Sequence, residues 1–270
     1  MHVLSVQDLS CMGKCSLTVA LPILSAMGHS TSVLPTAVLS THTGFPDPVV
    51  QPMTENLLPF AAHMASVGAG FDAICTGYLS DPIQAEAVCQ VLDKFDCLKV
   101  IDPAMGDHGK LYARMTPEHV EAMKKLCRRG NFLLPNLTEA AFLTGLPYRE
   151  DGDGVYLKEL CDGLASFGAD GSIITGVRWD EEHTGWAGLF GGQFFSYQAK
   201  RIGRSQHGTG DMFAAVTTGA LTLEKPLHAA AALAARFVEQ VIAVTPLSTP
   251  LAPILSRCFP GCGSNYNFTL

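Results

Sequence analysis

Residues 98–134 read LKVIDPAMGDHGKLYARMTPEHVEAMKKLCRRGNFLL, and this stretch decides the fold. It begins with an apolar run at Leu98–Asp102 and continues through a glycine-containing loop into a helical pattern at Pro117–Arg129. A second apolar run follows at Asn131–Leu134. Two apolar strands joined by a helix form a parallel unit of the kind found in α/β proteins. The stretch therefore predicts an α/β fold.

The same alternation extends along most of the chain. Other predicted strands are Val3–Val6, Thr31–Leu39, Ala73–Thr76 and Ser172–Thr175, and other predicted helices are Leu17–Met27, Met53–Gly68, Pro82–Lys94, Thr138–Thr144, Tyr156–Phe167, Met212–Leu223 and Pro226–Val244. Because the strands are continuous apolar runs, we expect a mostly parallel central sheet with helices on both faces. Two short runs, Ala187–Phe190 and Gln193–Tyr197, flank Gly191-Gly192 and predict an antiparallel hairpin at one edge of that sheet.

The chain contains no low-complexity linker and no internal repeat. Residues 1–250 are therefore predicted to form a single domain, and residues 251–270, which contain several Pro and Gly, are expected to form an irregular tail.

The composition excludes several classes of protein. The chain has 18 Lys and Arg against 25 Asp and Glu, a formal charge of −7, which argues against a nucleic-acid-binding surface. A hydrophobic share of 47% with 16% charged residues indicates a large buried core. The N-terminus does not resemble a secretory signal, and the apolar stretch Ala229–Val244 is short and interrupted by Arg236 and Glu239. We therefore expect a cytoplasmic protein that does not enter a membrane.

The nine cysteines are scattered among apolar stretches, as expected for reduced thiols rather than a disulfide framework. Cys11 and Cys15 have the same spacing as Cys258 and Cys262, which raises the possibility of a four-thiolate zinc site. Structural zinc usually uses tight pairs on short turns, whereas Cys11 to Cys15 reads as a loop that enters a helix. We therefore do not predict a zinc site, and the role of these cysteines stays open.

The sequence Gly208-Thr209-Gly210-Asp211 opens the apolar helix that begins at Met212. The two glycines allow the backbone to approach a ligand closely, and the free amides of the first helical turn form an anion site. A carboxylate beside such a site is able to accept a proton from a hydroxyl group that attacks a bound phosphate. The alternative is that Asp211 only caps the helix, since Asp is favoured there.

Two further polar clusters follow predicted strands. Asp102 stands at the end of one strand, where α/β sheets bind their ligands, and is able to hold Mg²⁺ or its water shell. Asn136 and Glu139 follow the next strand and are able to meet phosphate oxygens or the waters of a metal ion. The alternatives are an ordinary surface turn at Asp102 and helix capping by Asn136, Thr138 and Glu139.

Together these motifs resemble a known family. They are Asp102-Pro103-Ala104-Met105-Gly106-Asp107, Pro135-Asn136 with Glu139, and Gly208-Thr209-Gly210-Asp211, in that order along the chain. The chain resembles the vitamin-kinase branch of the ribokinase superfamily, and within it the pyridoxal kinases. Val3-Leu4-Ser5-Val6-Gln7, Ser40-Thr41-His42-Thr43-Gly44 and Thr76-Gly77-Tyr78 resemble the opening strand, the vitamin-side loop and the turn beside the substrate ring of that branch. The resemblance extends from about Val3 to Val244 and implies a ribokinase-like three-layer sandwich.

The resemblance also implies an activity and the residues that perform it. The activity is ATP-dependent phosphorylation of the 5′-hydroxymethyl group of a B6 vitamer (pyridoxal, pyridoxamine or pyridoxine), with Mg²⁺ and in a homodimer; a monovalent-cation requirement is left open. Asp211 is implied as the base, and Gly208, Thr209 and Gly210 as the anion hole. On the vitamin side the resemblance implies Asp8, Thr43, Tyr78 and Asp211. At the metal it implies Asp102 and Glu139. ATP would be bound by Asp102, Asn136, Glu139, Thr175, Gly176 and Gly208, and Gly106–Tyr112 would form the lid.

Departures from the family pattern leave the substrate open. Many pyridoxal kinases have serine and then histidine where this chain has Asp8 and Leu9. A carboxylate at Asp8 would favour a vitamer that carries an amine through a charge-assisted hydrogen bond. Related hydroxymethylpyrimidine kinases share the fold, and some have a cysteine in the lid or at the position of Asp211; the lid here has none. A non-catalytic vitamin-binding protein is the alternative from another class, and the retention of Asp211 and the glycines argues against it.

Overall fold

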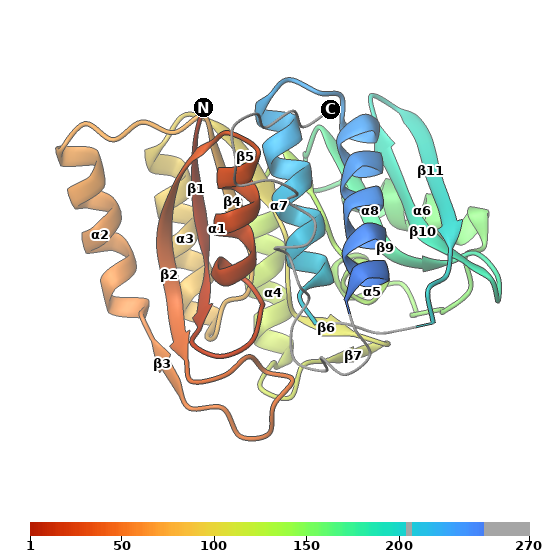
Figure 1. Ribbon diagram of the computed structural model, residues 1–270, viewed down its shortest axis with the longest axis horizontal. Coiled ribbons are helices and arrows are strands. Elements are labelled where there is room, and N and C mark those ends of the chain that lie inside the picture. The colour runs from red at the N-terminus through yellow and green to blue at the C-terminus, as the bar shows by residue number, and fades with distance from the viewer. Residues whose placement is uncertain (204–206, 246–270) are drawn as a thin grey trace.

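The computed structural model describes residues 1–203 and 207–245. The strands of its main sheet are β1 (His2–Ser10), β2 (Ser30–Leu39), β3 (Val50–Pro52), β4 (Ala73–Thr76), β5 (Leu98–Ile101), β8 (Phe132–Leu133), β9 (Gly171–Arg178), β10 (His183–Phe190) and β11 (Gln193–Lys200). They form a nine-stranded sheet in the order β11-β10-β9-β8-β5-β4-β1-β2-β3 (Figure 1). The strands from β9 to β2 in this order are parallel, whereas β10 and β11 at one edge and β3 at the other are antiparallel. The predicted mostly parallel α/β sheet is confirmed.

Helices cover both faces of this sheet. They are α1 (Leu17–Ala26), α2 (Thr54–Ser66), α3 (Pro82–Lys94), α4 (Pro117–Cys127), α5 (Leu137–Thr144), α6 (Gly154–Ala165), α7 (Thr209–Thr222) and α8 (Leu227–Val244). One buried cluster joins α1, α7 and α8 to the sheet, and a second joins α2 to α6 to the opposite face. Figure 1 shows α1, α7 and α8 together in front of the sheet. The predicted three-layer sandwich is therefore confirmed.

The predicted hairpin is present at the edge formed by β10 and β11. Gly191 and Gly192 connect the two strands with positive φ angles of 57° and 75°, and Phe190 pairs with Gln193. This is the backbone that two-residue hairpin turns require and that glycine adopts freely. The antiparallel β3 at the other edge is a strand that sequence periodicity did not predict.

Several strands are longer or shorter than predicted. β1 continues past Val6 to Ser10, with an irregularity between Gln7 and Leu9, so Asp8 lies within the strand. β9 continues past Thr175 to Arg178 because the antiparallel β10 supplies hydrogen-bonding partners for the extra residues. In both cases pairing with a neighbouring strand extends the element beyond its apolar run.

The predicted lid forms a small hairpin of its own. β6 (Gly106–Asp107) pairs with β7 (Lys110–Leu111), and His108 and Gly109 make the turn with positive φ angles of 51° and 73°. One end of the sheet is formed by the carboxyl ends of β1, β4, β5 and β8. The lid and the N-terminus of α7 belong to connections at this same end. Open α/β sheets bind their ligands at the carboxyl ends of their strands.

The apolar helix α8 is longer than the apolar stretch Ala229–Val244 considered in the sequence. It begins at Leu227 and its 18 residues, with a mean hydropathy of 1.4, are long and apolar enough to cross a membrane by length and composition, although it includes Arg236 and Glu239. In the structure 39% of these residues are buried, and the helix packs against α7. Tyr197 in β11 donates a hydrogen bond to Glu239 at 3.1 Å. These contacts are those of an outer layer of the sandwich.

The cysteines of the described residues, Cys11 and Cys15 among them, are free thiols. The predicted irregular tail, with Cys258 and Cys262, lies outside the described residues.

Candidate functional site

The N-terminus of α7, the predicted anion site, begins at Gly208. Gly208 caps the helix with a φ of 79°, and a Cβ added to it would overlap the carbonyl oxygen of Lys14, so this position accepts only glycine without rearrangement. A Cβ added to Gly210 would have no neighbour within 4 Å. Gly210 and Asp211 lie in the first turn of α7, where the helix has no carbonyl that could accept from their amides, as at any helix start. Among the described residues there is thus space beside Gly210.

Asp211 lies in the first turn of α7 and faces Asp8 from β1. Burial raises the pKa of Asp211 to about 6, and the charge of Asp8 adds to this shift. The hydroxyl and backbone N–H of the nearby Ser16 oppose the shift. With a pKa near 6, Asp211 is ionised at neutral pH and is poised to accept a proton.

Asp8 is buried, with 3% of its surface exposed, and lies close to Tyr78. Ser10 donates a hydrogen bond to Asp8 Oδ2 at 3.1 Å, and burial raises the pKa of the Asp8 carboxyl. Tyr78 is buried in the turn after β4, whose backbone is held by a 2.8 Å hydrogen bond from Thr36 Oγ1 to the Tyr78 carbonyl. The structure therefore brings together Asp8, Tyr78 and Asp211, three residues predicted to face one substrate.

Asp102 and Glu139 form a second acidic group near Asp211. Asp102 is 9% exposed, and burial together with the charges of Glu139 and Asp211 raises its pKa well above the usual range. Burial also raises the pKa of Glu139 to about 7. Buried carboxylates that repel one another at the edge of a sheet are a common mark of a cation-binding or catalytic site.

The capping alternative for Asn136 and Glu139 is realised in the structure. Asn136 Oδ1 accepts from the Glu139 amide at 3.0 Å, and Glu139 Oε2 accepts from the Asn136 amide at 2.8 Å. The same side chains also hold the base of the lid: Glu139 Oε1 accepts from the Met105 amide at 3.0 Å, and Asn136 Nδ2 donates to the Gly106 carbonyl at 2.7 Å. Both residues thus tie the lid to α5 while keeping the Glu139 charge beside Asp102.

Tyr112, at the end of the lid, belongs to the site although the sequence singled it out only as a lid boundary. Although 37% of Tyr112 is exposed, the desolvation of its hydroxyl and the charges of Glu139, Asp102, Asp107 and Asp211 raise the pKa of that hydroxyl. Its amide donates to the Met105 carbonyl at 3.0 Å, which closes the lid hairpin. Only the folded hairpin places this hydroxyl near the carboxylates, so no local sequence signal indicates it.

Thr175 and Gly176 lie beside Asn136 at the same edge. Thr175 forms a bridge with Asn136, and its amide donates to the Pro135 carbonyl at 2.9 Å. Gly176 is exposed and has a φ of 71°. Their position next to the lid base agrees with the predicted nucleotide side.

Thr43 is exposed on the loop after β2. Its neighbour His42 is buried, and the His42 ring lies 4.8 Å from the ring of His207 and 4.8 Å from that of Phe45. Since His207 directly precedes Gly208, this ring contact places the vitamin-side loop beside the anion cradle.

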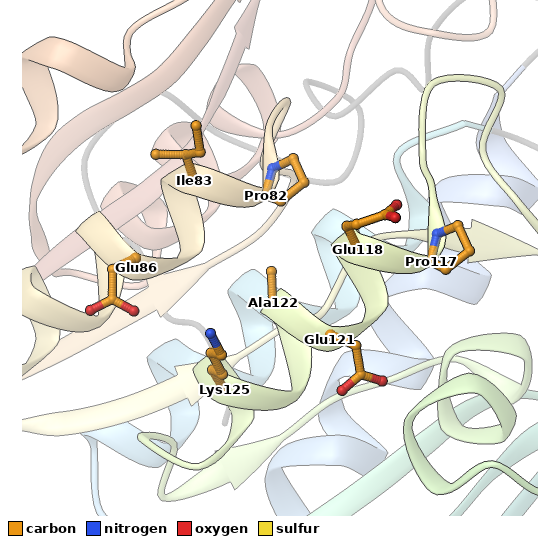
Figure 2. A pocket seen from close by; sticks show the side chains of 8 residues that line it. All are labelled: Pro82, Ile83, Glu86, Pro117, Glu118, Glu121, Ala122 and Lys125. Carbon is orange, nitrogen blue, oxygen red and sulfur yellow. The ribbon is translucent and has the colours of Figure 1, made fainter.

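A separate hollow of about 500 Å³ lies between α3 and α4 (Figure 2). It is lined by Pro82, Ile83, Glu86, Pro117, Glu118, Glu121, Ala122 and Lys125. None of the residues placed above in the site lines it, so it is not the candidate active site.

Comparison with known proteins decides the family. Residues 24–250 match the family model described as phosphomethylpyrimidine kinase. This chain belongs to the phosphomethylpyrimidine kinase family. The predicted resemblance to kinases of the ribokinase superfamily is thereby confirmed, and the protein is a kinase of the pyridoxal kinase type.

Individual relatives of this kinase carry two names. A Bacteroides thetaiotaomicron structure assigned as a phosphomethylpyrimidine kinase, in a form with pyridoxal, is 35% identical with a TM-score of 0.91 over 95% of this chain and 93% of the other. The pyridoxal kinase from Lactobacillus plantarum is 34% identical with a TM-score of 0.83 over 90% of this chain and 87% of the other. A hydroxymethylpyrimidine/phosphomethylpyrimidine kinase from Bacillus subtilis is 29% identical over 72% of this chain and 71% of the relative. Both substrate classes are therefore represented among the relatives of this kinase.

Proposed function

We propose that this kinase transfers the γ-phosphoryl group of ATP to the 5′-hydroxymethyl group of a B6 vitamer. The observation that carries the proposal is the convergence of Asp8, Tyr78 and Asp211 beside the N-terminus of α7. A small polar ring bound beside Asp8 and Tyr78 would bring its hydroxymethyl group toward Asp211. The form of the Bacteroides relative with pyridoxal supports the same choice of substrate.

In this proposal Asp211 accepts the hydroxyl proton as the substrate oxygen attacks the γ-phosphorus. Its pKa of about 6 keeps it ionised at neutral pH without making it a strong base. The amides of Thr209 and Gly210, with Gly208 allowing close approach, stabilise the charge on the transferring phosphoryl group. The lid hairpin and Tyr112 would cover the phosphates and exclude water. Positioning and charge neutralisation thus supply most of the catalysis, as phosphoryl transfer requires.

The donor set at Asp102 and Glu139 fits Mg²⁺. Mg²⁺ prefers oxygen ligands and is usually held by one or two carboxylates together with substrate phosphates and water. Within residues 1–203 and 207–245 no group of three or more His, Cys, Asp or Glu side chains is placed to hold a metal ion. Asp102 would hold the ion directly, and Glu139, whose oxygens accept lid amides, would act through its waters. When bound, Mg²⁺ supplies positive charge at the ATP phosphates.

The second candidate function is phosphorylation of hydroxymethylpyrimidine, which the Bacillus subtilis relative favours.

Purified protein should be assayed with ATP, Mg²⁺ and pyridoxal, pyridoxamine, pyridoxine or hydroxymethylpyrimidine, each product being identified by mass spectrometry. We expect at least one B6 vitamer to be phosphorylated, and its kcat/KM to be higher than that of hydroxymethylpyrimidine. A higher kcat/KM for hydroxymethylpyrimidine would select the alternative, and no turnover of any vitamer would overturn the proposal. The homodimer and the cytoplasmic location stay predictions.

The acidic residues of the site lead us to predict a pH-dependent response to Mg²⁺. The pKa values of Glu139 and Asp211 are higher in the folded protein than in the unfolded chain. Their protonation therefore favours the folded state fully below about pH 4, and this contribution to the free energy of unfolding is lost as the pH rises through 6 to 7. We expect Mg²⁺ to raise Tm more at pH 8 than at pH 5.5, by a few degrees, since about 1 kcal/mol moves Tm by roughly 2–4 °C at this size. Thermal unfolding with and without Mg²⁺ at both pH values measures this.

Asp102→Asn keeps the shape of the side chain but removes the buried charge. The variant should have a higher Tm than the wild type at pH 8 without Mg²⁺ and should lose most of the Mg²⁺ response. Asp96→Asn, at an exposed position in the turn before β5, serves as the control and should behave as the wild type. An unchanged Mg²⁺ response in Asp102→Asn would remove Asp102 from the proposed metal site.

Asp8 predicts a preference among vitamers. A buried carboxylate beside the substrate forms a charge-assisted hydrogen bond with the amine of pyridoxamine, which the aldehyde of pyridoxal is unable to form. Asp8→Ser should therefore lower the ratio of kcat/KM for pyridoxamine over pyridoxal by about tenfold or more. Asp8→Asn, which keeps the volume and removes the charge, should lower the same ratio. Steady-state kinetics with both vitamers measures it, and an unchanged ratio in both variants refutes the hypothesis.

A further inference from the structure

The side chain of Gln84, in the first turn of α3, is fully buried and uses all of its hydrogen-bonding capacity. Its Nε2 donates to the Thr36 carbonyl at 2.6 Å and to Thr54 Oγ1 at 3.0 Å. Its Oε1 accepts from the Ser80 amide at 2.9 Å and from the Ser80 hydroxyl at 3.4 Å. A side-chain amide has two donor hydrogens and two acceptor lone pairs, so no polar group of Gln84 is left unpaired. One residue thus joins β2, α2 and the turn that follows β4.

Capping of α3 explains only a small part of this arrangement. In a capping box the third helical residue, here Gln84, accepts from the amide of the N-cap residue, which is Asp81. Gln84 instead accepts from Ser80, and Asp81 caps the helix through its own side chain, which accepts from the Ile83 amide at 2.8 Å. The two bonds that Gln84 donates reach residues 48 and 30 positions earlier in the chain. The side chain therefore fixes tertiary structure and not only the start of α3.

Thr36, the partner of Gln84 in β2, holds the same turn at a second point. Its Oγ1 donates to the Tyr78 carbonyl at 2.8 Å, while its own carbonyl accepts from Gln84. Together Thr36 and Gln84 therefore bind the turn at Tyr78 and again at Ser80. Thr36 is fully buried. Loss of one of these bonds would leave a buried polar group without a partner, which costs more free energy than the bond contributes on balance.

The turn held in this way lies against the strand that carries Asp8. The pairing of β1 with β4 continues into the turn, because the Gly77 amide donates to the Val6 carbonyl at 3.1 Å. A Cβ added to Gly77 would lie 2.9 Å from the Gln7 side chain, so the turn and β1 are in direct contact. Tyr78 and Asp8 are the next residues of these two segments. The position of the turn therefore decides where the Tyr78 ring lies relative to Asp8.

We propose that Thr36 and Gln84 are positioning residues that fix the Tyr78 ring at the vitamin side of the site. The inference rests on the proposed function, because it takes Tyr78 as one of the residues that face the vitamer. Thr36 and Gln84 act through the backbone of the turn and not through contact with the substrate. Displacement of the ring would weaken binding of the vitamer, since small misplacements of positioning groups have large effects. The ATP side, carried by α5 and α7, would stay in place.

Thr36→Val tests this role with little disturbance, because valine keeps the branched shape of the side chain and removes the hydroxyl. We expect the KM for the preferred B6 vitamer to rise about tenfold or more, while the KM for ATP stays at the wild-type value. Thr36→Ser restores the hydroxyl and should return the KM for the vitamer close to that of the wild type. Gln84→Met, which removes all four bonds, should raise this KM at least as much as Thr36→Val. Steady-state kinetics with each substrate varied in turn measures these values.

Thr222→Val is the matched control. The Thr222 hydroxyl is also buried and donates to a backbone carbonyl at 2.8 Å, that of Thr218. It lies at the last residue of α7, whereas the predicted anion site lies at the first turn. Thr222→Val should lower Tm about as much as Thr36→Val and leave both KM values unchanged. An equal rise of the KM for the vitamer in the two valine variants would assign the effect to lost stability and overturn the inference.

Tyr78→Ala shows whether Thr36 acts through the ring. If it does, Thr36→Val should add little to the KM for the vitamer in the Tyr78→Ala background, whereas independent effects would multiply. Multiplied effects in the double variant would overturn the inference, and so would a wild-type KM in Thr36→Val. If Tyr78→Ala raises the KM for the vitamer while Thr36→Val does not, the positioning role fails and the proposed function stands. If the wild-type enzyme phosphorylates no vitamer, the proposed function fails together with the inference.

Discussion

Asp211→Asn should lower kcat by about 100-fold or more while leaving the affinity for ATP nearly unchanged. Asparagine keeps the size of the side chain, but it is unable to take a proton from the substrate hydroxyl. Because the anion cradle is built from the backbone of residues 208–211, its geometry is retained. Steady-state kinetics gives kcat, and calorimetric titration with a non-hydrolysable ATP analogue gives the affinity.

The competing explanation is that Asp211 serves only the N-terminus of α7 as a first-turn acid, although Gly208 is the N-cap and no side-chain cap bond is present. Asp81 offers a matched control, since its side chain caps α3 by accepting from the Ile83 amide at 2.8 Å and takes no part in the proposed site. Asp81→Asn should keep wild-type turnover. If Asp211→Asn resembles Asp81→Asn in kcat, Asp211 is a cap and not a base.

The wild-type pH profile provides a second test of the same residue. Asp211 must be ionised to act, and its pKa is raised to about 6 by burial, so kcat should fall as the pH drops below about 6. In an unperturbed aspartate the fall would come nearly two pH units lower, around 4. A kcat that stays constant down to pH 4.5 would contradict this assignment.

The α/β fold and the predicted motif loops could be inferred from the sequence because both depend on local patterns. Apolar runs bounded by turns gave β4 and α3 their observed limits, Ala73–Thr76 and Pro82–Lys94. The short strands β3, β6 and β7 were not predicted, since two or three residues carry no periodicity and pairing with a partner defines them. Local pattern thus predicts long elements, and tertiary pairing decides short ones.

The site shows the same division between local and distant causes. Asp211 and Asp102 were predicted because each follows a glycine-rich or strand-end signal. The place of Tyr112 near the carboxylates was not predicted, because only the folded lid hairpin brings its hydroxyl there. Glu139 was weighed as a helix-capping residue or as a site residue, and the structure shows that it caps α5 and also lies beside Asp102. A structure was needed to show that one carboxylate meets both demands.

Gly208→Ala should lower kcat by about 100-fold or more, an effect comparable to the loss of a backbone donor from an oxyanion hole. A Cβ at this position would overlap the Lys14 carbonyl, so either the segment that carries Ser16 or the first turn of α7 must move. Movement of the first turn of α7 displaces the amides of Thr209 and Gly210 from the phosphoryl group. The measurement is kcat and KM for ATP, with Tm determined on the same preparations.

Gly145 provides the matched control for backbone strain. It ends α5 with φ 76° and ψ 9°, nearly the same angles as the φ 79° and ψ 4° of Gly208, but a Cβ there would have no neighbour within 4 Å. Gly145→Ala should therefore cost about 1–2 kcal/mol of stability and leave kcat unchanged. Since the two substitutions impose the same left-handed conformation on alanine, a loss of kcat confined to Gly208→Ala isolates the close approach to Lys14 as its cause. Equal kcat values in the two variants would show that the cradle tolerates displacement and that α7 does not hold the transferring phosphoryl group.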